Sequence, residues 1–229
     1  MLILFALFSV ARVQEVEPVR VLLANGQWQE AARTAAALGT SEGFALAAEA
    51  LTDGGGVVPD QQKKALFLQA QEYARQAIRK GGNNPEGYFR LGVAQGRLAQ
   101  FVGILESLGL AKEVRRNLER ALQLGMNTAP PHVALGLWHA TVSSKGALAA
   151  VVTGASRSEA LAQFKTALTL EPDNLTARLE YAHALLLLDR TGNRSAALVQ
   201  LQVALGLTPA DAWQRRDLET ARLLLGSLK

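Results

Sequence analysis

The sequence predicts an all-α protein built as a stack of antiparallel helix hairpins, and three observations lead to this prediction. Ala and Leu dominate the 229 residues, and both lose little conformational freedom in a helix. Hydrophobic residues make up 49% of the chain and prolines number only seven, which argues against disorder. A spacing of small, large and small residues also recurs along the chain, which indicates helices that pack in a regular register.

The clearest copy of this spacing is Ala160, Phe164 and Ala167, which a proline follows. Small residues at the first and third positions let two helices approach closely, and the larger residue fills the space between them. The proline then ends the helix. Ser156 and Glu159 are spaced as a capping box that starts it. This segment is therefore predicted to be the second helix of a hairpin.

Similar segments place the other helices of the stack. The same spacing recurs as Ala70, Ala74 and Ala77, as Val114, Leu118 and Ala121, and as Ala197, Leu201 and Ala204. First helices are marked by Tyr88, Leu91 and Gly92, by His132, Leu135 and Gly136, by Tyr181 and Ala182, and more faintly by Phe44, Ala47 and Ala48. The last helix, predicted over Ala210–Leu228, has no partner after it and is expected to cap the stack.

Insertions between helices lengthen the predicted units. We place them at Thr52–Asp60, Phe101–Gly109, Ser143–Ser156 and Thr191–Asn193. The first of them contains the run Gly54, Gly55 and Gly56, which lacks the surroundings of a phosphate-binding loop and is predicted to form a turn.

The repeats resemble the tetratricopeptide (TPR) family over roughly Val16 to Lys229, although each unit is longer than that family's period of about 34 residues. The segments PHVALGLWHATVSSKG and EALAQFKTALTLEPDN look like an exported bacterial subfamily. They are similar to the T-component of TRAP transporters and, more distantly, to the helical domain of regulator-of-microtubule-dynamics proteins. The resemblance implies a TPR-like solenoid and, through the T-component, a periplasmic helper that docks a solute-binding protein. It assigns no role to individual residues.

Residues 1–13 match a secretory signal peptide. The apolar run Leu2–Val10 is too short to span a bilayer, which takes about 20 residues. Ser9 and Ala11 are placed as a cleavage site, although no basic residue precedes the run. The alternative is a buried first helix of the fold. We therefore expect an exported protein, periplasmic or extracellular, whose mature part is a single domain over residues 14–229 without a membrane span.

Composition excludes several classes of function. The chain contains no cysteine, which excludes disulfides, thiolate catalysis, cysteine metal sites and lipoprotein anchoring. Its formal net charge is +4 and its pI about 9.6. The basic residues are scattered rather than gathered in runs, and aromatic residues do not alternate with them. We expect no nucleic-acid binding, and nothing in the sequence indicates an oligomeric state.

Catalytic and metal-binding patterns are also missing from the sequence. His132, His139 and His183 lack the companion ligands that a zinc site needs, so we interpret them as structural, although His139 could line a groove beside Trp138. No serine has the surroundings of a hydrolase nucleophile, and no carboxylate pair stands at a readable spacing. The sequence therefore predicts no enzyme, no cofactor and no metal.

The expected binding site is the concave face of the stack, which the first helices of stacked hairpins line. The predicted groove is mostly apolar and comprises Phe89, Val93, Arg97, Val133, Leu137, Leu179, His183 and Leu186. Such a strip suits an apolar or helical segment of another protein. The alternative is that the insertions fold back into the groove, so that these residues are core.

Two functions are consistent with this reading. The first is a protein-binding scaffold or adaptor in the cell envelope, with a solute-binding protein or an envelope complex as partner. The second is a small-ligand or lipid carrier, whose apolar cavity would be walled by Phe101, Val102, Leu137 and the Val151–Val152 segment. An open groove favours the scaffold, and a closed cavity favours the carrier.

The abrupt change from the apolar run to a polar segment predicts processing of the precursor. N-terminal sequencing of the natively expressed, fractionated protein is expected to find a start at Arg12 or Gln14. A full-length chain in the cytosol would contradict this prediction.

Overall fold

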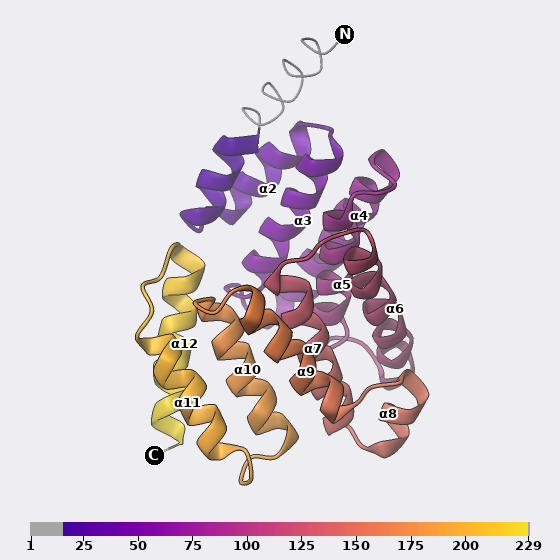
Figure 1. Ribbon diagram of the computed structural model, residues 1–229. Coiled ribbons are helices and arrows are strands. Elements are labelled where there is room, and N and C mark those ends of the chain that lie inside the picture. Colours follow the sequence, from indigo (N-terminus) through magenta and orange to yellow (C-terminus); the bar gives the residue numbers. More distant parts are fainter. Residues whose placement is uncertain (1–15, 229) are drawn as a thin grey trace. The chain divides into compact units, whose positions relative to one another are not determined.

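The computed structural model of the chain describes residues 16–228, and within them every regular element is a helix (Figure 1). This confirms the all-α prediction. The predicted signal peptide, residues 1–13, lies outside the described residues. Two compact units divide the chain, one ending at Phe101 and the other beginning at Val102. The sequence, which predicts one continuous domain over residues 14–229, did not indicate this division.

The first unit is a set of helices in which each packs on the next. A helix over residues 16–24 is followed by α2 (Trp28–Ala37), α3 (Ser41–Gly55), α4 (Asp60–Lys80) and α5 (Pro85–Leu98). Besides these sequential contacts, α3 also packs on α5. Contact between alternate helices is what a row of stacked hairpins requires, so the first helices of neighbouring hairpins lie side by side.

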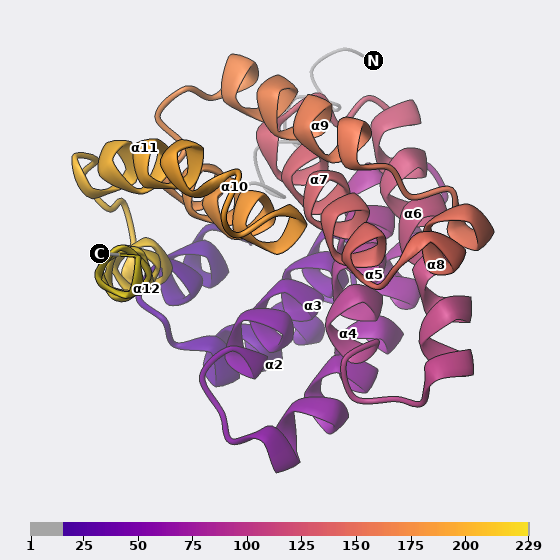
Figure 2. The ribbon, with the colours of Figure 1, turned by 90° about the horizontal axis from the view of Figure 1, so that it is seen from below.

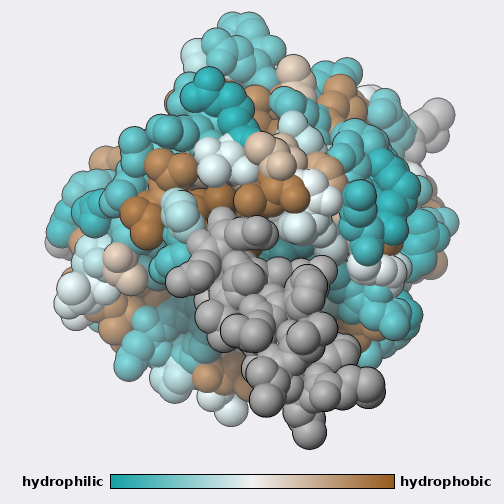
Figure 3. All heavy atoms as spheres, turned by 90° about the horizontal axis from the view of Figure 1, so that it is seen from above, coloured by the Kyte–Doolittle hydropathy of each residue, from teal (hydrophilic) through white to brown (hydrophobic). Residues whose placement is uncertain are grey.

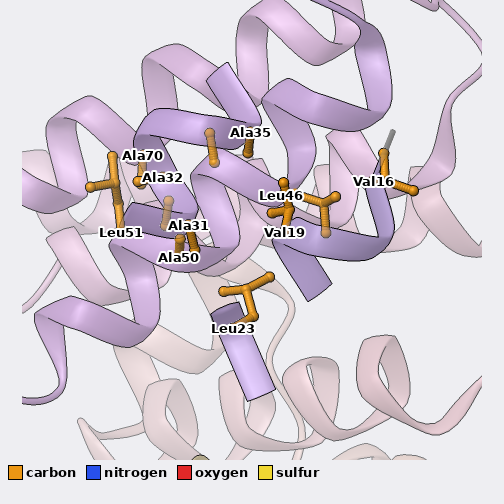
Figure 4. Close-up of a cluster of buried hydrophobic side chains, with 12 residues drawn as sticks. Val16, Val19, Leu23, Ala31, Ala32, Ala35, Leu46, Ala50, Leu51 and Ala70 are labelled. Atoms are coloured by element: carbon orange, nitrogen blue, oxygen red, sulfur yellow. The ribbon is translucent and has the colours of Figure 1, made fainter. Parts of the chain in front are cut away.

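Alanine dominates the core of the first unit (Figure 4). Three alanines of α2 meet leucines and alanines of α3, and Val19 and Leu23 of the preceding helix join them. The buried members labelled in the figure are Val16, Val19, Leu23, Ala31, Ala32, Ala35, Leu46, Ala50, Leu51 and Ala70. Because alanine side chains are short, the helix backbones lie close together in this core.

The glycine run corrects a sequence-based prediction. Gly54 and Gly55 form the last turn of α3 rather than a loop, and both are buried. A Cβ atom on Gly54 would lie 2.3 Å from the Trp28 ring, and one on Gly55 would lie 2.2 Å from the Phe67 ring. Two aromatic rings therefore pack directly on the α3 backbone. The prediction was wrong because the sequence alone does not distinguish a glycine at the end of a helix from a glycine in a turn.

The second unit is also a stack of helix hairpins, with longer insertions between the helices. It consists of α6 (Ile104–Gln123), α7 (Ala129–Ser144), α8 (Ala147–Thr153), α9 (Arg157–Leu170), α10 (Leu175–Leu188), α11 (Arg194–Leu205) and α12 (Ala212–Ser227). Here α7 packs on α6, α9 and α10, while α10 also packs on α9, α11 and α12. The last helix covers α10 and α11, as the predicted cap does.

The repeated spacing identifies the core correctly. Every residue of its four copies is buried, in both units. Phe164 stacks on Tyr181, with ring centroids 4.9 Å apart, and this contact joins α9 to α10. Opposite it, a Cβ atom on Gly136 of α7 would lie 2.7 Å from the Phe164 ring. The second helix α9 therefore presses its large residue against the first helix α7 at a point where α7 has no side chain.

Hydrogen bonds tie the first helices together at their N-terminal ends. The Ser41 hydroxyl donates to the Ala77 carbonyl at 2.7 Å and accepts from the Asn84 amide at 2.8 Å. In the second unit, one Glu171 carboxylate oxygen accepts from the Ala129 backbone N–H at 2.9 Å, and the other accepts from the Asn174 amide at 2.7 Å. Each tie joins the starts of two first helices through the end of the intervening second helix.

Helices extend into three of the four predicted insertions, whereas Thr191–Asn193 lies within a turn between α10 and α11. The α6 helix begins at Ile104, inside the predicted insertion Phe101–Gly109, and α8 forms within Ser143–Ser156. Half of the predicted capping box of α9 forms: the Ser156 hydroxyl accepts from the Glu159 backbone N–H, but the Ser156 N–H donates to His139 rather than to the Glu159 carboxylate.

The tight contact at Gly55 predicts that an alanine there destabilises the protein, whereas an alanine at Gly109, another helical glycine, stabilises it. Gly55→Ala is expected to cost about 1–3 kcal/mol, because Phe67 must move away from the new methyl group. Gly109→Ala, in α6, meets no atom within 4 Å and is expected to stabilise by up to about 1 kcal/mol. Chemical denaturation of both variants measures the difference, and a stabilised Gly55→Ala would refute the packing described here.

Candidate functional site

The first unit carries a cleft along the exposed face of its first helices. Its volume is about 690 Å³. It is lined by Val16, Arg20, Gly39, Thr40, Ser41, Glu42, Ala45, Leu46, Glu49, Lys80, Gly81, Asn84 and Glu86. Five of these side chains are charged, so the cleft suits a ligand with charges and hydrogen-bonding groups better than a purely apolar one.

The floor of the cleft depends on helix starts that the sequence builds locally. Thr40 caps α3 by accepting from the Gly43 backbone N–H at 3.0 Å, and Asn84 caps α5 by accepting from the Glu86 N–H at 3.0 Å. The Asn84 amide also donates to Ser41. Each cap residue therefore closes its own helix, and Asn84 in addition holds the two helices side by side.

A fixed ion network lies on one wall of the cleft. The Arg90 guanidinium contacts Glu49 of α3 at 2.8 Å and Glu86 of α5 at 2.7 Å, and it lies 5.0 Å from the centre of the Phe89 ring. Burial by itself would lower the pKa of Arg90, but Glu49 and Glu86 outweigh it and raise that pKa. Arg90 is thus a permanent positive charge that joins neighbouring first helices.

A second ion pair at the cleft is exposed. Arg20 and Glu42 meet at 2.9 Å, and about half of each side chain is accessible to solvent. Exposed pairs of this kind contribute little to stability. These two groups can therefore exchange their mutual contact for contacts with a ligand at small cost, whereas the Arg90 network cannot.

The predicted groove residues of the first unit are only partly accessible. Arg97 is exposed and Val93 half-buried, both on α5. Phe89 is 5% exposed, so its prediction as a groove residue is wrong. The predicted apolar character is also wrong for this unit, because α3 and α5 bring Glu49, Glu86 and Arg90 to the same face. The face of the molecule in Figure 3 is mainly hydrophilic, with hydrophobic residues in smaller groups.

In the second unit the predicted residues divide between surface and core. Val133 and Leu137 of α7 are half-buried, packed on the cluster around Phe164. His183 of α10 is partly exposed, with Nδ1 3.6 Å from the Glu180 carboxylate. Leu179 and Leu186 are buried, because α11 and α12 cover their side of α10. Their prediction as groove residues is therefore wrong. These two and Phe89 are core residues, but for Leu179 and Leu186 the helices α11 and α12 provide the cover rather than the insertions of the alternative prediction.

The site residues that the sequence reasoning missed are the charged ones. Glu86 lies four residues before Arg90, and this spacing brings two side chains together on a helix. This ion pair could therefore have been predicted from the sequence. The partnership of Arg90 with Glu49, and of Arg20 with Glu42, joins helices far apart in sequence and has no local signal.

His139 serves the fold rather than a groove. Its ring is buried, lies edge-on to Trp138 at 4.7 Å, and accepts a hydrogen bond at Nδ1 from the Ser156 backbone N–H at 3.2 Å. That hydrogen bond requires the neutral ring with its proton on Nε2. The predicted possibility that His139 lines a groove is therefore wrong.

Two further features are absent from residues 16–228. In this range no three His, Asp or Glu side chains gather closely enough to hold a metal ion. Within the same part of the chain, no helix has both the length and the apolarity that crossing a bilayer requires.

Comparison with known proteins adds a family and a fold. The family model described as regulator of microtubule dynamics protein 1-3 matches residues 42–229. Regulator of microtubule dynamics protein 1 of Bos taurus is 26% identical over 140 residues, which are 58% of this chain and 42% of that protein. The match thus spans about two fifths of the relative's length. The crystal structure of a thermophilic TPR protein of Thermus thermophilus has a TM-score of 0.66 at 22% identity, covering 92% of this chain and 98% of that one. That likeness confirms the TPR-like fold.

The buried His139 predicts a dependence of stability on pH. Burial lowers the pKa of His139 below its usual value near 6.5. As pH falls through about 6.5 the unfolded chain takes up a proton at this position before the folded chain does, so the free energy of unfolding decreases. Denaturation between pH 7.5 and about 5 is expected to show this decrease, and His139→Gln is expected to weaken the dependence. Identical pH profiles of the two proteins would contradict it.

Proposed function

Since this chain belongs to the regulator of microtubule dynamics protein 1-3 family, we propose that it is a non-enzymatic scaffold that binds another protein. The cleft of the first unit is the observation that carries the proposal. Stacked hairpins of the TPR type present their first helices as a binding surface. Here that surface, on α3 and α5, is both hollowed and supplied with charged groups.

The chemistry of the cleft favours a polar segment of a protein partner. Arg20 and Lys80 offer cationic donors, and Glu42 offers a carboxylate acceptor. An extended polypeptide supplies backbone donors and acceptors together with charged side chains, and can satisfy both kinds of group. The Arg90 network holds α3 and α5 at a fixed spacing, so the cleft is formed before the partner arrives, which reduces the ordering cost of binding.

The second unit offers a less charged face of its own. Val133 and Leu137 are half-buried on α7, and Leu187 and His183 are accessible on α10. Partly exposed aliphatic side chains beside a histidine suit an apolar anchor of a partner. Val93 and Arg97 of the first unit, with Val133, Leu137 and His183 of the second, remain the predicted groove residues that a partner can reach.

The carrier alternative loses the cavity wall on which it depends. Val151 is 80% exposed and Val152 45% exposed, so this segment does not close an apolar cavity. Phe101 instead packs on Phe67, with ring centroids 5.8 Å apart. The scaffold is therefore the function we propose.

We further propose that the scaffold works outside the cytoplasm, in the periplasm or the extracellular space. The apolar run Leu2–Val10 and the absence of cysteine support this location. A solute-binding protein or another envelope complex is then the expected partner, as the resemblance to the T-component implies.

Charge reversal in the cleft tests the proposal. Glu42→Lys is expected to weaken capture of a partner from envelope extract about tenfold, because it breaks the pair with Arg20 and inverts a ligand contact. Glu30→Lys, on the exposed side of α2 and outside the cleft, is the matched control. Circular dichroism checks that both variants are folded. If Glu42→Lys captures the same proteins as strongly as Glu30→Lys does, the cleft is not the binding site.

A further inference from the structure

The short helix α8 displays the most exposed group of aliphatic side chains in the second unit. Leu148 is 79% exposed, Val151 80% and Val152 45%. The helix lies between α7 and α9, contacts α6 and α7, and stands outside the regular register of hairpins. Figures 1 and 2 show it at the edge of this unit. Exposed aliphatic side chains gathered in one place mark a surface that is covered in use.

The position of α8 is fixed by buried and polar groups. Arg115 of α6 donates to the carbonyls of Thr153 and Gly154, at 3.3 Å each, while it also pairs with Glu119 at 2.7 Å. Just after the helix, the Ser156 N–H donates to the buried His139. Because the C-terminal end of the insertion is anchored in this way, the display of Leu148 and Val151 is built into the fold.

Glycines with positive φ make the turns on either side of α8. Gly146 has φ of 108° and Gly154 has φ of 75°, values that favour glycine. The seven residues between them carry no charge. The resulting structure is a compact apolar tip that projects from the hairpin.

The charges next to this tip are basic. Lys145 and Arg157 are the charged residues of the segment 143–158, and both are exposed, the Arg157 guanidinium also donating to the Leu188 carbonyl of α10 at 2.8 Å. Glu159 is the first acidic residue beyond it, and Glu119, on α6, is held by Arg115. The tip therefore combines aliphatic side chains with flanking cations.

Among possible occupants, an anionic lipid surface fits this combination. A second copy of the chain does not, since three side chains bury far less than the roughly 800 Å² per partner that a stable interface needs. A protein partner is disfavoured because α8 has no aromatic side chain and no exposed polar side chain beside its aliphatic ones, whereas binding hot spots are rich in Trp, Tyr and Arg. Peripheral membrane proteins usually bind by inserting aliphatic side chains into the lipid headgroup region, with lysine and arginine at its boundary.

We propose that α8 inserts into the surface of anionic membranes and docks the second unit on them. This inference goes beyond the protein-binding scaffold and uses none of the cleft residues. It also differs from a lipid carrier, because the lipid stays in the bilayer and the protein comes to it.

The absence of cysteine allows a site-specific test on the full-length chain. Leu148→Cys and Leu223→Cys each provide one attachment point for a polarity-sensitive fluorophore. Leu223, in α12, is 77% exposed and is the matched control. On addition of vesicles of phosphatidylcholine and phosphatidylserine, the label at 148 is expected to shift to the blue and to be quenched by brominated lipid. The label at 223 is expected to stay unchanged, and the apolar run Leu2–Val10 cannot produce such a difference.

Affinity measurements complete the test. Leu148→Asp is expected to lower affinity for these vesicles at least about tenfold, and Leu223→Asp to leave it unchanged. Lys145→Gln is expected to lower it roughly fivefold on anionic vesicles and not at all on pure phosphatidylcholine. Circular dichroism confirms folding, and Lys145→Gln, at an exposed position outside the core, keeps the test valid if Leu148→Asp is misfolded.

Two results would overturn the proposal. One is an equal response of the labels at 148 and 223. The other is protection of the label at 148 by a lipid-free protein fraction of the envelope, without a response to vesicles, which would make α8 a protein-docking element. Because the cleft variant Glu42→Lys leaves α8 intact, loss of partner capture in that variant and loss of vesicle binding in Leu148→Asp remain separate outcomes.

Discussion

The fold depends on places where two helices meet with almost no side-chain volume between them. A Cβ atom on Gly43 of α3 would lie 2.5 Å from the Ala35 carbonyl oxygen, and one on Gly87 of α5 would lie 3.0 Å from Ile78. Gly136 plays the same part against Phe164 in the second unit. Since protein interiors are close-packed, even one methyl group at such a position forces the helices apart. The first helices can line a common face because these contacts allow the hairpins to stack so closely.

This constraint explains which parts of the structure the sequence predicts. Small residues at helix contacts repeat in a fixed spacing, so the hairpins and their buried residues can be read directly from the chain. The exposed face of a first helix has no such signal. Leu179 and Leu186 are buried because α11 and α12 pack against them, and Glu49 meets Arg90 because α3 lies beside α5. Both facts arise from tertiary packing, which no local pattern contains.

The two units use the same construction to present different chemistry. In the first, a partly buried guanidinium between two carboxylates stiffens a charged cleft, and the exposed pair of Arg20 and Glu42 leaves groups free to rearrange. In the second, Arg115 joins α6 to the insertion and supports an apolar tip. In each case an arginine bridges elements that are distant in sequence. The planar guanidinium suits this role because it offers several donors in a fixed geometry and keeps its charge when buried.

The ties at the helix starts have a mechanical consequence. Ser41 with Asn84 in the first unit, and Glu171 with Ala129 and Asn174 in the second, fasten neighbouring first helices at their N-terminal ends. In the first unit the Arg90 network joins the same two helices, α3 and α5, a second time, farther along their length. A pair of helices that is held at two levels resists twisting about either one, so α3 and α5 respond to load or to a bulky ligand as a single plate.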